Sequence, residues 1–236
     1  MKKNSLKYLL ASFICASFVC LMYNTEVNDA EILEVDNKTI KDNSIDLLEG
    51  KTIVIDPGHG GVDIGTTGLT YGTSEKEVNL TVAQNIKREL EERTAAIVVL
   101  TREKDIDLGR NQKESLQKRI QIADKASADL YISIHHDAFT DPSVNGITVH
   151  YSSHQNMSKK LAKVLNSSIF KHTINAKNRG IRDSDYYVLK NNSAPSVLLE
   201  LGFTSNKEDE IRMVSKDFQN KTSVSIVDGI IEFFAT

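Results

Sequence analysis

The sequence predicts an α/β domain whose sheet is covered by helices on both faces. From residue 51 onward, short apolar segments typical of strands alternate with longer segments in which apolar residues recur at helical spacing. No internal repeat or low-complexity tract interrupts this alternation, so we expect residues 51–236 to form one domain. A hydrophobic content of 40% in a chain of 236 residues is sufficient for a substantial core.

The first strand and the first helix are separated by a glycine-rich loop. Residues 53–55, Ile-Val-Ile, are typical of a buried strand, and the Asp-Pro-Gly-His-Gly-Gly that follows ends it in a loop. Ser74 and Glu77 are spaced as a capping box, which places Glu75 in the first turn of the predicted helix. The apolar stripe of this helix consists of Val78, Val82, Ile86 and Leu90.

Four further strands and three further helices complete the predicted domain. The strands are expected at residues 97–100, 130–134, 146–153 and 196–201. The helices are expected at residues 116–126, 155–170 and 224–234. Because functional groups in such sheets gather beyond the carboxyl ends of the parallel strands, we expect the site at that edge.

Residues 1–23 have the pattern of a membrane-targeting segment. Lys2, Lys3 and Lys7 precede sixteen uncharged, mostly apolar residues from Tyr8 to Tyr23. This pattern is typical of a membrane anchor or of a cleaved signal peptide. We favour an uncleaved anchor, because the residues before the candidate cleavage position fit poorly and the lysines favour a cytoplasmic N-terminus. The rest of the chain would then lie outside the cell membrane.

Charge and cysteine content exclude several classes of protein. Residues 24–50 carry eight acidic and two basic side chains, and we interpret them as an acidic spacer. Residues 51–236 carry 24 basic and 24 acidic side chains, so their charge does not indicate nucleic-acid binding. Because Cys15 and Cys20 both lie in the apolar segment, the domain has no disulfide, thiolate metal ligand or cysteine nucleophile.

Four polar side chains at predicted strand ends and a helix start indicate a metal site. His59 follows the first strand, His135 ends the strand that begins at Leu130, and Glu200 lies near the end of the strand at 196–201. Glu75 opens the first helix. A catalytic zinc site needs about three protein ligands, and without cysteine these must be histidine and carboxylate.

Each of these residues also has a simpler interpretation. A loop histidine is more often solvated than metal-bound, and Glu75 is well placed to interact with the helix dipole. Glu200 is harder to explain in this way, since a carboxylate in a buried apolar run needs a partner or a function. The residues alone leave open which glutamate would bind metal and which would act as a base. We interpret the remaining histidines as structural or surface groups: His136, His150, His154 and His172.

Six strings of the sequence occur in the order and spacing of a known family. They are IVIDPGHGG, SEKEVNL, LYISIHHDA, NGITVHY, RGIRDSDYYVL and PSVLLELGFTSN. Over residues 51–236 the chain resembles the zinc-dependent N-acetylmuramoyl-L-alanine amidases of the Amidase_3 type. The resemblance implies a mixed, mostly parallel sheet of about six strands flanked by helices. It also implies one Zn²⁺ per chain held by His59, Glu75 and His135, with Glu200 as the catalytic residue.

The reaction that the resemblance implies is hydrolysis of peptidoglycan at the amide bond between N-acetylmuramic acid and the L-alanine of the stem peptide. Zinc would activate a water molecule, and Glu200 would act as the general base. Arg179 would either contact a carboxylate or phosphate-like group of the substrate or serve as a structural ion-pair partner. Two alternatives remain open: a zinc peptidase that acts within stem peptides, and a non-catalytic wall-binding or regulatory module.

Two departures from the family bear on regulation and targeting. Only seven residues separate Ala138 from Gly146, where some members carry a long insertion with an inhibitory helix. No wall-binding module is recognisable, so the anchor and spacer would position the domain. We expect a monomeric catalytic domain that acts on peptidoglycan outside the cell membrane, with secretion to the cell wall as the alternative. The sequence leaves open whether a membrane-protein activator is required.

Overall fold

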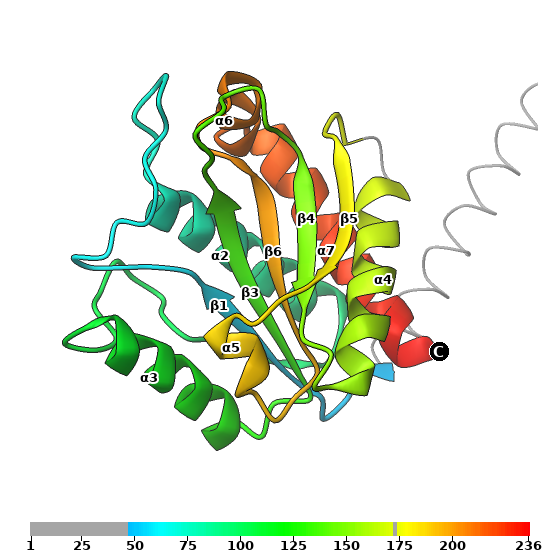
Figure 1. The fold of residues 1–236 in the computed structure, drawn as a ribbon. Coiled ribbons are helices and arrows are strands. Elements are labelled where there is room, and N and C mark those ends of the chain that lie inside the picture. Colours follow the sequence, from blue (N-terminus) through cyan, green and yellow to red (C-terminus); the bar gives the residue numbers. More distant parts are fainter. Residues whose placement is uncertain (1–46, 172–173) are drawn as a thin grey trace, which may run out of the picture. The chain divides into compact units, whose positions relative to one another are not determined.

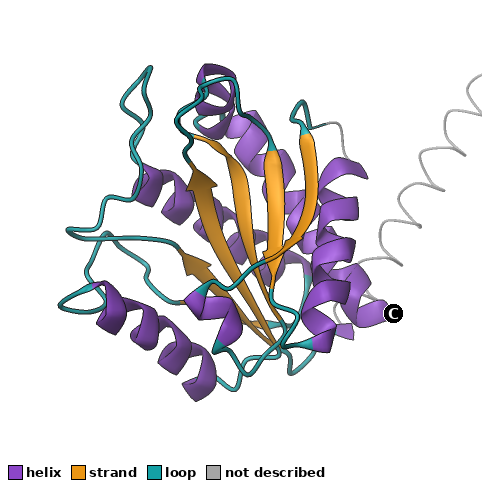
Figure 2. Ribbon diagram, viewed as in Figure 1, coloured by secondary structure: helices purple, strands orange, loops and turns teal. Residues whose placement is uncertain are grey.

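A six-stranded sheet with helices on both faces forms the part of the chain that the structure describes, residues 47–171 and 174–236 of a computed structural model (Figures 1 and 2). The strands are β1 (Thr52–Pro57), β2 (Ile97–Leu100), β3 (Leu130–Asp137), β4 (Ile147–Tyr151), β5 (Asn178–Asp183) and β6 (Ser196–Phe203). The helices are α2 (Glu75–Arg93), α3 (Gln112–Lys125), α4 (Asn156–Lys171), α5 (Tyr187–Lys190), α6 (Lys207–Met213) and α7 (Lys216–Ala235).

The strands lie in the order β2-β1-β3-β6-β4-β5 across the sheet. The four strands from β2 to β6 are parallel to one another, whereas β4 is antiparallel to β6 and parallel to β5. The carboxyl ends of β1, β3 and β6 therefore meet at one edge of the sheet. The predicted mixed, mostly parallel sheet of about six strands is confirmed.

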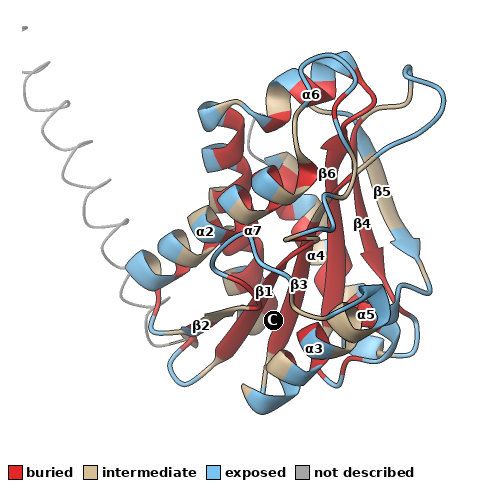
Figure 3. Cartoon of the chain, turned by 90° about the vertical axis from the view of Figure 1, so that its left-hand side faces the viewer, coloured by how far each residue is buried: buried red, intermediate tan, exposed pale blue. Residues whose placement is uncertain are grey.

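Each face of the sheet packs against its own set of helices. Alternate residues of a strand point to opposite faces, so Leu199 of β6 packs in one core and Leu198 in the other. The larger core lies between the sheet and α2, α4 and α7, and the smaller core lies under α3 and α5. The central strands β1 and β6 are buried along their whole length, and β3 is buried except at His135 and Asp137 (Figure 3). A central strand of this kind holds a functional side chain in a fixed place.

All five strands and four helices expected from the sequence are present, and three short elements were not predicted. The edge strand β5 reads Asn-Arg-Gly-Ile-Arg-Asp, which lacks the apolar alternation of a half-buried strand. The helices α5 and α6 have four and seven residues, too few to show a helical period. Helix α7 begins at Lys216, eight residues before the predicted start at 224, because polar residues fill its first turns.

The capping box predicted for α2 is wrong. Ser74 is the N-cap residue, but its hydroxyl makes no capping hydrogen bond and is buried without a partner. The start of the helix is instead tied to the preceding loop, because the Glu75 amide donates to the carbonyl of Thr66 at 3.1 Å. The predicted stripe of Val78, Val82, Ile86 and Leu90 is confirmed, since all four side chains are buried.

Several predicted features lie outside the described residues. They are the membrane-targeting segment at 1–23, most of the spacer at 24–50, and His172. The domain begins before the expected boundary at residue 51, since the Leu48 side chain is fully buried in the larger core. Among residues 47–171 and 174–236, none of the helices has the length and apolar character needed to cross a bilayer.

Candidate metal centre and catalytic pocket

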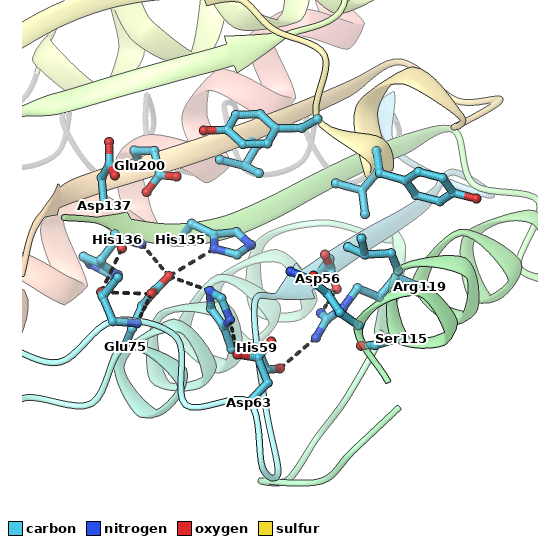
Figure 4. Close-up of a pocket in the computed structure, with 17 residues that line it drawn as sticks. Asp56, His59, Asp63, Glu75, Ser115, Arg119, His135, His136, Asp137 and Glu200 are labelled. Atoms are coloured by element: carbon cyan, nitrogen blue, oxygen red, sulfur yellow. Dashed lines mark hydrogen bonds and ion pairs between the residues drawn. The ribbon is translucent and has the colours of Figure 1, made fainter. Parts of the chain in front are cut away.

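Three side chains that were predicted to bind metal converge at the carboxyl edge of the sheet (Figure 4). His59 comes from the loop after β1, Glu75 is the first residue of α2, and His135 lies in β3. Their ligand atoms all lie within 4.8 Å of one another. Glu75 Oε1 lies 3.1 Å from His59 Nε2 and 3.1 Å from His135 Nδ1. Residues separated by up to 76 positions are thus brought to one point.

The glycine-rich loop turns the His59 side chain toward this point. His59 has a φ angle of 60°, in the left-handed region that most residues avoid, and Gly60 and Gly61 also have positive φ angles. Asp63 fixes the far side of the ring, since its Oδ1 lies 2.9 Å from His59 Nδ1. The turn of the loop explains why an imidazole is surrounded by glycines in the sequence.

Two glycines leave the space that the ligand side chains occupy. A Cβ atom on Gly58 would lie 2.2 Å from Cε1 of His135, much closer than van der Waals contact allows. A Cβ atom on Gly65 would lie 2.5 Å from Oε2 of Glu75, and this residue also has a φ of 67°. The backbone therefore forms a cradle around the three donor side chains. At these two positions any residue larger than glycine would occupy the space that the donors fill.

Hydrogen bonds fix the orientation of the Glu75 carboxylate. Its Oε2 accepts bonds from the amide and the hydroxyl of Thr66, at 2.7 and 3.0 Å. The His136 amide and the Asn79 side chain approach Oε1 at 3.2 and 3.3 Å. Burial acts to raise the pKa of Glu75, but its bonds to His135 and His59 outweigh burial and hold the pKa well below its usual range. Glu75 is therefore an oriented, buried anion.

Two buried guanidinium groups support the loop that carries His59. Arg119 of α3 pairs with the fully buried Asp56 and donates to the carbonyls of Pro57 and His59 at 2.8 and 2.7 Å. Arg102 donates to the carbonyls of Pro57 and Gly58 at 3.0 and 2.8 Å. Burial disfavours the ionised form of Asp56, yet the Arg119 charge and neighbouring hydroxyl groups lower its pKa overall. Sequence reasoning missed this network, because nothing in the sequence separates these arginines from surface ones.

Glu200 lies beside the three converging residues on the neighbouring strand. It is the register partner of His135 in the β3–β6 ladder, and it faces the same side of the sheet as Leu198. Its side chain is buried and its Oε2 has no hydrogen-bond partner among the described residues. Burial raises the pKa of Glu200 well above its usual range, and the carboxylates of Asp137 and Glu75 raise it further.

These groups line one pocket of about 320 Å³. His59, Glu75, His135 and Glu200 occupy one end, and residues of α3 and α5 form the walls. The wall residues include Ser115 and Leu116 from α3 and Tyr187 and Val188 from α5. The four residues singled out in the sequence thus share a cavity of the size that binds small polar molecules or polymer ends.

The structure places Arg179 away from this pocket. Its guanidinium lies 5.0 Å from the ring centroid of Phe203 and donates to the Asn145 carbonyl at 3.2 Å. Arg179 is absent from the residues that line the cavity. Arg179 thus contacts an aromatic ring and a carbonyl, its Nε is buried without a hydrogen-bond partner among the described residues, and its charge opposes the rise in the pKa of Asp137, which lines the pocket.

Three of the four other histidines are described: His136 and His150 are buried and hydrogen-bonded, His154 is exposed, and His136 also lines the pocket. His136 points to the opposite face from His135, as expected for the next residue of a strand, and its Nδ1 lies 2.8 Å from Asn79 Oδ1. Burial lowers the pKa of His136 to about 4. His150 pairs with the Ser184 hydroxyl at 2.7 Å, and His154 is exposed.

The donor set and its surroundings fit a zinc ion. Two imidazoles and one carboxylate, without thiolates, are a common ligand set of catalytic zinc and leave a coordination position open. The His59 ring and the Glu75 carboxylate are held by groups outside the donor set, Asp63 and Thr66, as metal ligands usually are. The three donors are also packed within a cradle that admits no other side chain.

Comparisons with known proteins agree with this geometry. A family model described as N-acetylmuramoyl-L-alanine amidase matches residues 53–232. The probable cell wall amidase LytH of Staphylococcus aureus is 38% identical over 189 residues, which cover 80% of this chain and 60% of the relative. The chain spans about half the length of the curated relatives it matches, from 39% to 60%.

Two solved structures resemble the fold over nearly their whole length. The N-acetylmuramoyl-L-alanine amidase AmiC2 of Nostoc punctiforme has a TM-score of 0.73 and 35% identity, covering 80% of this chain and 99% of that chain. The CwlD amidase from Clostridioides difficile, solved in complex with the GerS lipoprotein, has a TM-score of 0.74 and 31% identity. That likeness covers 79% of this chain and 99% of the CwlD chain.

Proposed function

Because the chain belongs to the Amidase_3 family of N-acetylmuramoyl-L-alanine amidases, we propose that it hydrolyses peptidoglycan at the amide bond between N-acetylmuramic acid and L-alanine. The observation that carries this proposal is the convergence of His59, Glu75 and His135 beside Glu200 in one pocket. A module that had lost catalysis would have no need for a buried carboxylate without a partner at this position.

The metal we propose is a single Zn²⁺ held by His59, Glu75 and His135. The mixed imidazole and carboxylate donors and the absence of cysteine from residues 51–236 support this choice. When bound, zinc supplies a Lewis acid that polarises a carbonyl, lowers the pKa of water and favours ionised carboxyl groups nearby. Fixing the three ligands before the metal binds reduces the reorganisation that binding requires.

Glu200 is the proton carrier in this proposal. Its Oε2 has no competing partner, so the carboxylate is free to accept a proton from the attacking water and to hold it during the reaction. It then returns the proton to the departing alanine nitrogen. The products are a free lactyl carboxylate on the sugar and a stem peptide with a free amino group. The buried position keeps bulk water from competing for the proton.

Product analysis tests the reaction. The described domain, incubated with purified peptidoglycan and zinc, should release peptides that begin with a free L-alanine and leave lactyl carboxylates on the glycan. Mass spectrometry of the products distinguishes this cut from peptidase cleavage, which would leave L-alanine on the sugar. Peptides cut internally would favour the zinc peptidase, and the absence of product from both the domain and the membrane-bound chain would favour a binding module.

We also propose that residues 8–23 hold the domain outside the cell membrane, with residues 24–46 as spacer. Sixteen helical residues span about 24 Å, less than a hydrocarbon core of about 30 Å, so flanking residues or local thinning must compensate. The CwlD relative is solved in complex with a lipoprotein, and on this observation we propose a membrane-associated protein partner for this chain, with activation as its expected effect. Isolated membranes should contain the intact N-terminus, and the chain purified with them should be more active than the domain alone. A mature N-terminus beyond residue 24 in the medium would contradict the anchor.

A further inference from the structure

Arg182 of β5 faces the catalytic side of the sheet and has no hydrogen-bond or ion-pair partner among the described residues. It is the register neighbour of His150 in β4, and His150 is the register neighbour of Leu198 in β6. Register neighbours point to the same face, and Leu198 lines the catalytic pocket. Arg182 is exposed and makes no hydrogen bond or ion pair with any residue that the structure describes. An unpaired cation therefore lies on the same face as Glu200.

The spacing of the strands places Arg182 near the pocket. Neighbouring strands are about 4.8 Å apart, so the Arg182 backbone lies about 10 Å across the sheet from Leu198. Between them, the His150 ring contacts the ring of Tyr186, another pocket residue, with centroids 5.1 Å apart. Burial, Glu200 and Asp137 raise the pKa of Tyr186 to about 12, and the Arg182 charge opposes that rise. The field of Arg182 thus reaches groups inside the pocket.

The pocket itself has a shortage of free positive charge. Its lining contains five carboxyl groups: Asp56, Asp63, Glu75, Asp137 and Glu200. Arg119 is the only arginine or lysine among the lining residues, and its guanidinium is already bonded to Asp56 and to two carbonyls. A cation outside the lining would therefore add to the positive charge that the proposed Zn²⁺ offers an anionic substrate.

We infer that Arg182 binds a carboxylate of the stem peptide and so determines a preference for anionic substrates. This inference rests on the proposed function. In peptidoglycan, the residue that follows L-alanine carries either a free carboxylate or a carboxamide beside its link to the rest of the stem. An extended residue spans about 3.3 Å, so this group lies within a few ångströms of the amide bond that is cut. A guanidinium binds a carboxylate through two parallel hydrogen bonds, which a neutral carboxamide cannot match.

A pair of defined substrates tests the inference. One is a muramoyl dipeptide whose second residue carries the free carboxylate. The other is the same molecule with a carboxamide in place of that carboxylate. Neither substrate contains phosphate. The kcat/KM of the zinc-loaded domain is measured on both for the unaltered protein, Arg182→Gln, Arg182→Lys and Lys163→Gln. Lys163 is exposed on α4, which covers the other face of the sheet, so its variant is a control with the same change of charge.

The unaltered domain should prefer the carboxylate. Arg182→Gln should lower kcat/KM for that substrate by roughly tenfold to a hundredfold, mainly through KM, and leave the carboxamide nearly unchanged. Arg182→Lys should retain part of the preference, and Lys163→Gln should retain all of it. If Arg182→Gln does not fold, Arg182→Lys tests the inference instead. Full retention of the preference for the carboxylate substrate in Arg182→Lys would then overturn the inference.

Two outcomes separate this inference from the proposed function. Cleavage of both substrates, with Arg182→Gln matching the unaltered domain or losing equally on both, would overturn the inference and leave the amidase function standing. Failure of the unaltered domain to cleave either muramoyl peptide at the lactyl amide would overturn both.

Discussion

Glu200→Gln is expected to lower turnover by roughly 10²-fold to 10⁴-fold while leaving zinc content near one per chain. Glutamine keeps the shape of the side chain and fits the same buried position in β6, but it cannot take up a proton. The three donor residues are untouched, so metal binding should persist. Steady-state kinetics on peptidoglycan fragments and metal analysis of the same preparation measure the two quantities together.

Glu77→Gln is the matched control for this variant. This variant makes the same chemical change at an exposed residue of α2, in the turn that also carries Glu75. It should leave both activity and zinc content unchanged. Near-normal activity of Glu200→Gln would contradict the mechanism. Loss of zinc from Glu200→Gln with retention of zinc by Glu75→Gln would also contradict it, because the roles of the two glutamates would then be exchanged.

Removing a metal donor should cause loss of the metal itself, whereas Glu200→Gln should keep it. Changes in the groups that merely orient a metal ligand cost 10-fold to 100-fold in affinity, so His59→Ala, His135→Ala and Glu75→Gln should each weaken zinc binding by more than about 100-fold. The loss should be larger for the two alanine variants, which remove a donor entirely, than for Glu75→Gln. Competition with a zinc chelator gives the dissociation constants, and activity should fall in parallel.

His154→Ala provides the comparison for the histidine variants. His154 is exposed in the turn before α4 and contributes no donor to the cluster. It should bind zinc as tightly as the unaltered domain. Stoichiometric, chelator-resistant zinc in His59→Ala or His135→Ala would show that the metal is held elsewhere. Excess zinc should restore part of the activity of the Glu75 variant, because glutamine keeps one oxygen donor.

The sequence contains enough information to predict that the site residues converge, because the apolar runs and the proline and glycine residues that follow them determine where strands end. Residues 53–55 stop at a proline and glycines, so His59 had to lie beyond a carboxyl end of the sheet. The same logic applies to His135 and Glu200. What the pattern could not supply was the division of roles between Glu75 and Glu200, which depends on which carboxylate reaches both imidazoles.

The arginines show the limit of pattern reasoning most clearly. The string Arg-Gly-Ile-Arg offers two candidates for a substrate contact, and the sequence does not tell which one faces the pocket. The contacts in the structure decide the matter, on the two sides of a register shift between Asn178 and Ile181: Arg179 packs on Phe203, whereas Arg182 shares its register with His150 and Leu198. A register shift depends on tertiary packing and leaves no local signal.

The support beneath the His59 loop also determines how the protein can move. Loops that carry functional groups usually belong to the parts of a protein that open most readily, with few buried contacts. Here Arg102 and Arg119 bond to three successive carbonyls of the loop, so local opening would expose two buried guanidinium groups and the carboxylate of Asp56 at once. Such an opening should cost far more free energy than that of an ordinary surface loop. We therefore expect adaptation to a bulky polymer at the pocket wall, where Tyr186 and Tyr187 are exposed at the start of α5, while the metal-binding edge stays fixed.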